Sequence, residues 1–366
     1  MSTEAQWATY RGVQVLRFIA ALMVLLSHAT AVVTDRHLSS LIPRWTNGHS
    51  GVDIFFVISG FVMYSSCAGS GADEGAWRRF ALKRIARVVP LYWIATTAKL
   101  VLLLAVPWAT QSSGVSIRHA LASYAFLPQL FPAGTPVPLL PVGWTLNFEM
   151  FFYAMCTIAL YRHRRPLSIV GPAFAILAVL GISSHRAGPM ETTYANPLLL
   201  EFLAGMFVAK FAQSLRELHW RIAVAALIVG MLGDLLIEAD GSALRVLFWG
   251  GSSAIAVAGA VSLESKIRVH IGRPLLLLGD ASYALYLVHT FVVPALTIIA
   301  IKRGGIGPWG LIAVSTLCSV GASVAIFRYV ESPIGRRLKT WINHIAPPVS
   351  GMSTIGGGRF ARRAAR

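Results

Sequence analysis

Long apolar stretches, broken by short polar segments, follow one another along almost the whole chain. A helix needs about 20 mostly apolar residues to cross the hydrocarbon core of a bilayer. Stretches close to that length occur at residues 13–33, 50–68, 88–106, 141–161, 167–183, 195–212, 221–237, 245–263, 278–301 and 309–329. The pattern therefore predicts an all-α integral membrane protein with about ten transmembrane helices.

The hydrophobic content agrees with a membrane protein, but the net charge suggests a different class of protein. Of 366 residues, 55% are hydrophobic and only 13% are charged, whereas about a quarter of the residues are charged in a typical soluble domain. The formal net charge is nevertheless +17. A strongly basic balance often marks a nucleic-acid-binding protein, so the positions of the basic residues decide how the charge is interpreted.

The basic residues gather on one side of the predicted spans. With the N-terminus inside, 23 of the 32 Lys and Arg residues fall on the inner side, 7 fall on the outer side, and Arg17 and Lys99 fall within spans. An excess of Lys and Arg in cytoplasmic loops is the positive-inside signature. We therefore predict that both termini are cytoplasmic, that the charge sets the topology, and that no nucleic acid is bound.

Two segments lie outside the predicted bundle. Residues 107–140 form a long external stretch with five prolines, which we expect to pack over the outer mouth, because long ordered loops are often functional. At the other end, a membrane domain at residues 1–341 is followed by a cytoplasmic tail at 342–366. The tail is rich in Gly and Arg towards its end, so we expect it to be disordered and to approach anionic membrane lipids.

The three cysteines do not form a metal-binding pattern. Cys67, Cys156 and Cys318 all lie in apolar runs, far apart in the sequence. Such positions are typical of small buried hydrophobic side chains. The spacing favours neither a disulfide framework nor a zinc site, and we predict no metal.

Ionisable side chains inside predicted spans are costly in lipid and commonly mark functional sites. Arg17 and His28 both lie in the first span, eleven residues apart. That spacing places them about 20° from the same helix face and about 16 Å apart along it. His28 is a candidate general base near neutral pH. The alternative is a core histidine that is hydrogen-bonded to a neighbouring helix.

Two arginines lie at the inner end of the third span. Arg84 and Arg87 are one helical turn apart and share a face. Paired guanidinium groups suit phosphate oxygens better than a single lysine does. The pair is therefore a candidate phosphate site, although the spacing alone favours simple anchoring to anionic lipids.

The fourth span carries a polar stripe. Thr145, Glu149 and Tyr153 follow each other at intervals of four residues, so they share one helix face. Glu149 lies several residues inside the bilayer and needs a partner, for which His28 and Arg17 are the candidates.

Other spans also carry polar side chains. Ser282, Tyr286 and His289 form a stripe on the ninth span. Asp53 adds a carboxylate to the second span. Trp144, at the start of the fourth span, fits either a substrate channel or an interfacial aromatic belt, and its position favours the belt. Polar stripes on at least four spans predict a buried polar cavity.

Several motifs, taken in order, resemble membrane-bound acyltransferase family 3, which includes bacterial O-acetyltransferases of exopolysaccharides, O-antigens and nodulation factors. The motifs are Arg17 with His28, residues 51–61, Arg84 and Arg87 with residues 90–93, residues 143–153, residues 282–289, and Glu331-Ser332-Pro333. The resemblance covers roughly residues 11–337. Residues 143–153 are especially similar to the branch that acetylates succinoglycan-type exopolysaccharide.

The resemblance implies a membrane acyltransferase domain in the bacterial inner membrane. It implies acetyl-CoA as the acyl donor, taken from the cytoplasm, and a glycan hydroxyl as the acceptor, on an exopolysaccharide, an O-antigen or a lipo-chitooligosaccharide. Within that frame, Arg84 and Arg87 would hold the CoA phosphates and Arg17 would line the thioester channel. His28 would deprotonate the acceptor hydroxyl or carry the acyl group transiently.

The same frame assigns roles to the other polar side chains. Glu149 would orient His28 by a hydrogen bond, as a carboxylate does in a catalytic triad. The substrate channel would be lined by Asp53, Trp144, Tyr153, Ser282, Tyr286 and His289. The acyl group would pass either directly to the glycan or to a separate periplasmic protein. The alternative function is a transporter or flippase for a lipid-linked sugar, which would also combine about ten spans with buried charges.

Overall fold

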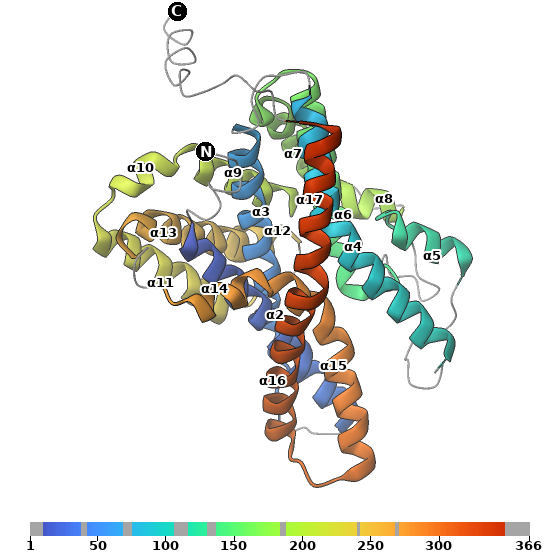
Figure 1. Cartoon of the computed structure of the whole chain (residues 1–366). Helices are drawn as coiled ribbons and strands as arrows, with labels where there is room; N and C mark the ends of the chain where they lie inside the picture. Colours follow the sequence, from blue (N-terminus) through green and yellow to red (C-terminus); the bar gives the residue numbers. More distant parts are fainter. Residues whose placement is uncertain are drawn as a thin grey trace, which may run out of the picture.

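The computed structural model describes residues 10–37, 42–68, 75–105, 116–129, 137–183, 188–239, 242–267 and 271–347, and within these ranges it contains helices and no strand. Each of the ten predicted segments contains a helix (Figure 1). These helices are α2 (Arg11–His37), α3 (Gly51–Ala68), α4 (Ala76–Ala105), α6 (Trp144–Tyr161), α7 (Pro166–Ser183), α9 (Leu199–Lys210), α11 (Trp220–Leu236), α13 (Gly251–Ile267), α15 (Ser282–Arg303) and α16 (Pro308–Ile326).

Shorter elements connect or extend these helices. They are the 3₁₀ turns η1 (Thr46–Ser50) and η3 (Pro141–Gly143), the helices α5 (Ile117–Tyr124), α8 (Pro189–Tyr194), α10 (Ala212–Glu217), α12 (Ser242–Arg245), α14 (Arg273–Asp280) and α17 (Ser332–Ile345), and two π-helical segments, η4 (Val246–Gly250) and η5 (Phe327–Glu331). Such π segments are rare and often occur at functional sites.

Seven helical runs in the described ranges are long and apolar enough to cross a membrane. They are Arg11–Arg36, Thr46–Ala68, Ala76–Ala105, Pro166–Ser183, Ala243–Glu264, Ser282–Arg303 and Pro308–Ile345. The chain is therefore an all-α integral membrane protein, as predicted. Of the other three predicted spans, α9 has only 12 residues, which is about 18 Å of helix against a hydrocarbon core of about 30 Å. The count of ten spans and the cytoplasmic termini stay predictions.

Helix α2 lies at the centre of the bundle and contacts α3, α13, α14, α15 and α16. Its first turn is held by a carboxylate from α13, because Glu264 accepts hydrogen bonds from the backbone N–H groups of Arg11 (2.8 Å) and Gly12 (2.9 Å). The first N–H groups of a helix have no partner within it, and a negative charge there is favourable. This contact sets the position of the helix that carries Arg17 and His28.

Helices α3 and α9 cross at very short range. A Cβ atom added to Gly60 would lie 2.0 Å from the carbonyl oxygen of Phe202, and one added to Gly205 would lie 1.9 Å from that of Val57. Small residues allow such close backbone approach at helix contacts in membranes. The crossing fixes the position of α3, the helix that carries Ser59, relative to α9.

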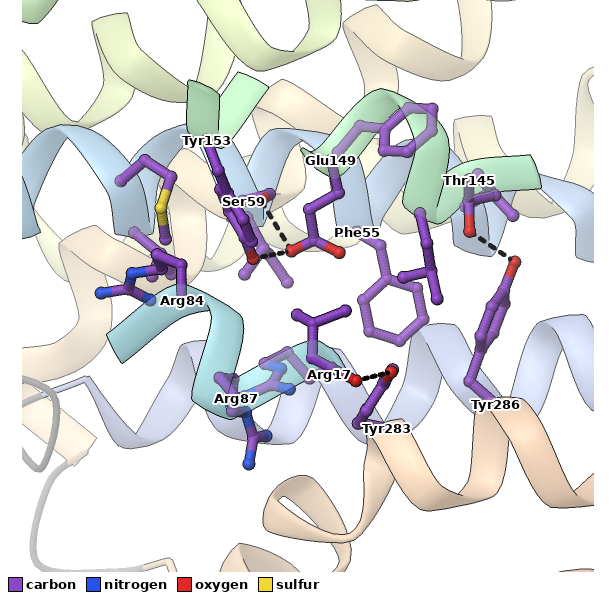
Figure 2. Close-up of a pocket in the computed structure, with 17 residues that line it drawn as sticks. Arg17, Phe55, Ser59, Arg84, Arg87, Thr145, Glu149, Tyr153, Tyr283 and Tyr286 are labelled. Atoms are coloured by element: carbon purple, nitrogen blue, oxygen red, sulfur yellow. Dashed lines mark hydrogen bonds between the residues drawn. The ribbon is translucent and has the colours of Figure 1, made fainter. Parts of the chain in front are cut away.

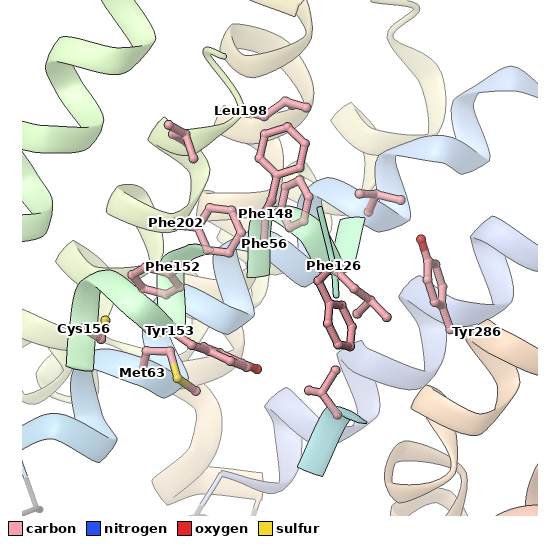
Figure 3. Close-up of a cluster of buried hydrophobic side chains, with 14 of the residues drawn as sticks. Phe56, Met63, Phe126, Phe148, Phe152, Tyr153, Cys156, Leu198, Phe202 and Tyr286 are labelled. Atoms are coloured by element: carbon pink, nitrogen blue, oxygen red, sulfur yellow. The ribbon is translucent and has the colours of Figure 1, made fainter. Parts of the chain in front are cut away.

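A cluster of aromatic rings joins α3, α6, α7 and α9 (Figure 3). The ring of Phe202 lies 4.6 Å from Phe56 and 4.8 Å from Phe152, and Phe152 lies 5.7 Å from Phe174. Lipid tails are as apolar as these rings, so close packing rather than removal from water holds the helices together. Phe148 and Phe152 of α6 pack in this cluster, and Tyr153 of the polar stripe belongs to it as well.

The structure describes the predicted external stretch and the predicted C-terminal tail only in part. In the stretch 107–140, α5 packs on α4 through a hydrogen bond from the Tyr92 hydroxyl to the Ser123 carbonyl (3.2 Å), while residues 106–115 and 130–136 lie outside the described ranges. At the C-terminal end, α17 continues to Ile345. Most of the predicted tail, residues 348–366, also lies outside those ranges, so the domain boundary at residue 341 stays a prediction.

Candidate active site

A cavity of about 130 Å³ lies between α2, α3, α4, α6 and α15 (Figure 2). Six of the predicted site residues line it, namely Arg17, Arg84, Arg87, Glu149, Tyr153 and Tyr286. Ser59, Thr145 and Tyr283 also line it. The predicted polar cavity therefore exists, and it collects side chains from helices that are far apart in the sequence.

Three guanidinium groups reach this cavity. Arg84 donates a hydrogen bond to the Ser66 hydroxyl (2.8 Å), and its buried Nε has no partner within the described ranges. Arg87 forms a salt bridge with Glu331 at the end of η5. Arg17 has no salt bridge within the part of the chain that the structure describes. This end of the cavity is therefore cationic and suits an anion.

Glu149 has partners other than the predicted ones. It accepts hydrogen bonds from the Ser59 hydroxyl (3.2 Å) and from the Tyr153 hydroxyl one turn further along α6. Figure 2 shows these three side chains together across the cavity from Arg17 and Arg87. The hypothesis that Glu149 orients His28 is wrong for this structure, because the polar face of α6 points to α3 and into the cavity, which His28 does not line.

The polar stripe on α6 is hydrogen-bonded to α15. The Thr145 and Tyr286 hydroxyls are hydrogen-bonded to each other (3.0 Å), and the Tyr286 hydroxyl also donates to the Val142 carbonyl (3.1 Å). Thr145, Glu149 and Tyr153 all line the cavity, which confirms that they share one face. Ser282, at the start of α15, is buried and does not line the cavity.

His28 lies next to His289. The Nδ1 atom of His28 is 2.8 Å from the Nε2 atom of His289, and the two rings are nearly parallel, with their centroids 5.1 Å apart. His49 contacts His28 edge to face at 5.6 Å. On the cavity side, the ring of Tyr286 lies 6.1 Å from His289 and 5.8 Å from Phe55. Tyr286 thus lines the cavity and contacts His289, whereas neither His28 nor His289 lines the cavity.

Asp53 and Trp144 belong to a second polar cluster. Asp53 is fully buried and accepts two hydrogen bonds from Arg245, at 3.0 and 2.8 Å. The guanidinium of Arg245 lies over the rings of Trp144 (5.9 Å) and Trp249 (5.4 Å). Neither Asp53 nor Trp144 lines the cavity. The side chain of Arg245 is partly buried, and its charge pairs with Asp53 of α3.

A family model described as "Acyltransferase domain" matches residues 10–328. The chain belongs to acyltransferase family 3. It is 34% identical to the exopolysaccharide production protein ExoZ of Rhizobium meliloti (strain 1021), over 80% of this chain and 92% of that protein. It is 27% identical to nodulation protein 10 of Rhizobium leguminosarum bv. viciae, over 87% and 91%, and 26% identical to the acyltransferase MdmB of Streptomyces mycarofaciens, over 76% and 77%. No solved structure matches.

These comparisons confirm the family that the motifs indicated, and the protein is a multi-pass membrane acyltransferase. The likeness to an exopolysaccharide production protein agrees with the branch that residues 143–153 resemble. Within the described ranges, the acyltransferase has no group of three or more His, Cys, Asp or Glu side chains that could hold a metal ion.

Two buried carboxylic acids, Glu201 and Asp234, are not among the residues that the sequence singled out. Glu201 on α9 is 1% exposed, and its carboxylate oxygens have no hydrogen-bond partner within the described part of the chain. Asp234 on α11 is fully buried and accepts from the Ser253 hydroxyl at 3.2 Å. Both lie within predicted apolar spans, so the rule that singled out Arg17 and Glu149 also applied to them.

Proposed function

We propose that this acyltransferase transfers an acetyl group from cytoplasmic acetyl-CoA to a hydroxyl of a cell-surface or secreted glycan, and that it works in the bacterial inner membrane. Family membership carries the reaction class. The likeness to an exopolysaccharide production protein and to a nodulation protein supports a saccharide acceptor. An exopolysaccharide, an O-antigen and a lipo-chitooligosaccharide all offer such a hydroxyl.

The cationic end of the cavity supports an anionic donor. Arg84 and Arg87 lie near the predicted cytoplasmic side of α4, where the phosphates of CoA are available, and guanidinium groups form strong charge-assisted hydrogen bonds with phosphate. The cavity of about 130 Å³ is close to the size of cavities that hold benzene, about 150 Å³. It suits the thioester end of the donor, with the nucleotide end outside and Arg17 beside the path of the thioester.

His28 is the group that performs the transfer in this proposal. An alcohol is a weak nucleophile until a base takes its proton. The hydroxyl oxygen of the glycan attacks the thioester carbon while an imidazole nitrogen of His28 accepts the hydroxyl proton. The C–S bond then breaks, and the sulfur of CoA leaves as a thiol after it receives that proton. Transient acylation of the same imidazole is the second route.

The position of His28 adds a condition. Since neither histidine lines the cavity and the ring of Tyr286, which does, contacts His289, an acyl group in the cavity reaches His28 only when Tyr286 moves aside. The glycan approaches from the outer side, beyond His49. Alternatively, a separate periplasmic protein takes over the acyl group. Membrane lipids surround the apolar outer faces of the helices.

Mass spectrometry of surface glycans tests the proposal. A strain that lacks the chain is compared with the same strain that carries it again on a plasmid. We expect each acetylated glycan to lose the mass of one acetyl group when the chain is absent and to regain it on complementation. A transporter or flippase for a lipid-linked sugar would instead change the amount of glycan at the surface without changing its acylation, and that result would contradict the proposal.

A further inference from the structure

Four polar atoms lie in a row between α15 and α2. The Nδ1 atom of His289 is 3.0 Å from the backbone carbonyl oxygen of Leu285, one helical turn earlier. On the other side of the same ring, the Nε2 atom of His289 is 2.8 Å from the Nδ1 atom of His28. His289 is fully buried. The two imidazoles therefore form a continuous hydrogen-bonded chain that ends on a backbone carbonyl.

The carbonyl at one end assigns the protons along this chain. A carbonyl oxygen only accepts hydrogen bonds, so the Nδ1 atom of His289 carries a hydrogen and donates it. A neutral imidazole has one donor and one acceptor nitrogen, which leaves Nε2 of His289 as an acceptor. The Nδ1 atom of His28 must then donate to it. The remaining nitrogen of His28, Nε2, consequently holds a lone pair.

Burial supports the neutral form of His289. A buried charge is stable only when it is paired, and no carboxylate forms a hydrogen bond or salt bridge with His289 within the described ranges. The two rings are nearly parallel, at an interplanar angle of 11°, and the hydrogen bond between them, of 2.8 Å, restricts rotation of the His28 ring. His28 is thus held in one tautomer and one orientation.

We propose that His289 is the positioning residue for His28. It fulfils the orienting role that a carboxylate has in a serine hydrolase triad, but as a neutral group: it holds the hydrogen on Nδ1 of His28 and thereby keeps Nε2 free to accept the proton of the glycan hydroxyl or to take the acyl group. This inference rests on the proposed role of His28 in transfer. It replaces Glu149, whose hydrogen bonds are with Ser59 and Tyr153, as the orienting group.

Two substitutions separate positioning from simple helix packing. His289→Phe keeps a ring of similar shape but has no acceptor for the Nδ1 hydrogen of His28. His289→Gln keeps an amide oxygen that accepts from His28 and an amide N–H₂ that donates to Leu285. His49→Phe is the matched control, because His49 contacts the His28 ring edge to face and has no hydrogen bond with it.

The measurement is the kcat and KM for acetyl-CoA of the purified full chain in detergent, with glycan as acceptor. We expect His289→Phe to lower kcat by about 100-fold or more, within the range of about 10²–10⁴ that positioned general acid–base groups contribute. KM for acetyl-CoA should change by less than about two-fold, since a positioning residue acts on the chemical step. His289→Gln should regain at least about ten-fold of the lost kcat, and His49→Phe should stay within a few-fold of the unaltered chain.

Two results would overturn the inference. One is an unchanged kcat for His289→Phe. The other is an equal loss for His289→Phe and His289→Gln, which would mean that His289 serves only to pack α15 against α2. His28→Ala, measured in parallel, separates the two proposals: if it stays active, the proposed role of His28 fails. If it is inactive while His289→Phe is fully active, only the positioning role fails.

Discussion

Arg87 on α4 is bound to Glu331, a residue 244 positions later in the chain, at the end of the π-helical segment η5. The carboxylate offsets the charge of Arg87. Arg84, one turn earlier, has a hydroxyl rather than a carboxylate as its hydrogen-bond partner, and its buried Nε has no partner within the described ranges. Of the two arginines, Arg84 is therefore the better placed to bind a phosphate group of the proposed donor, acetyl-CoA.

Replacing Arg84 should weaken donor binding. A hydrogen bond to a charged group contributes about 1.5–3 kcal/mol, so we expect Arg84→Ala to raise KM for acetyl-CoA by about ten-fold or more. Arg78→Ala is the control, because Arg78 lies on the same helix, is exposed and does not line the cavity. Initial rates at varied acetyl-CoA concentrations give the KM of each variant. Equal KM values for the two variants would remove Arg84 from the donor site.

The buried pair of Asp53 and Arg245 should dominate local stability. Removing one partner of a buried ion pair costs about 3–5 kcal/mol, because the other charge is left buried without a counter-charge. Asp53→Leu should therefore lower the thermal unfolding midpoint in detergent strongly. Asp35→Ala is the control, since the side chains of the Asp35–Arg44 pair are 41% and 59% exposed and such pairs contribute about 0–1 kcal/mol. Similar unfolding midpoints for the two variants would show that the buried Asp53–Arg245 pair contributes no more stability than the exposed pair.

The crossing of α3 and α9 should not tolerate a methyl group. A Cβ on Gly205 would overlap the Val57 carbonyl oxygen, and since backbone atoms form this contact, relief requires the two helices to separate. We expect Gly205→Ala to lower both the unfolding midpoint and the yield of folded protein. Gly321→Ala, where no atom lies within 4 Å of the added Cβ, should leave both unchanged. Equal behaviour of the two variants would show that the helices do not approach so closely.

The predicted sidedness can be tested with single cysteines. Arg164 lies in the turn between α6 and α7, and Ile306 lies in the turn between α15 and α16. The positive-inside count places the first inside and the second outside. With Cys318 replaced by alanine and the buried Cys67 and Cys156 retained, a membrane-impermeant maleimide should label Ile306→Cys in right-side-out vesicles and Arg164→Cys only after permeabilisation. The reverse pattern would invert the topology.

Sequence and structure agree most closely where the physics is local. A run of about 20 apolar residues predicts a membrane helix without knowledge of its neighbours. The helical period also placed Thr145, Glu149 and Tyr153 on one face, and they share the cavity. The cost of an ionisable group in lipid singled out Arg17, which lines that cavity as well.

Partners across helices could not be predicted in the same way. His28 pairs with His289, which is 261 residues away, and Asp53 pairs with Arg245, which is 192 residues away. Which side chains meet depends on the rotation and height of each packed helix, and a single sequence does not encode these locally. For the same reason Glu149 was assigned to His28, although the rotation of α6 turns it towards Ser59.

Transfer of a labelled acetyl group tests the central claim most directly. The purified chain in detergent is given acetyl-CoA labelled in the acetyl group, with de-acetylated surface glycan of the organism that carries the chain as acceptor. Label in the glycan and free CoA thiol are both quantified, for the unaltered chain and for His28→Ala. We predict that labelled glycan and CoA thiol form in equal amounts with the unaltered chain, and that His28→Ala forms neither above background. Absence of CoA release from the unaltered chain, or full transfer by His28→Ala, would contradict the account.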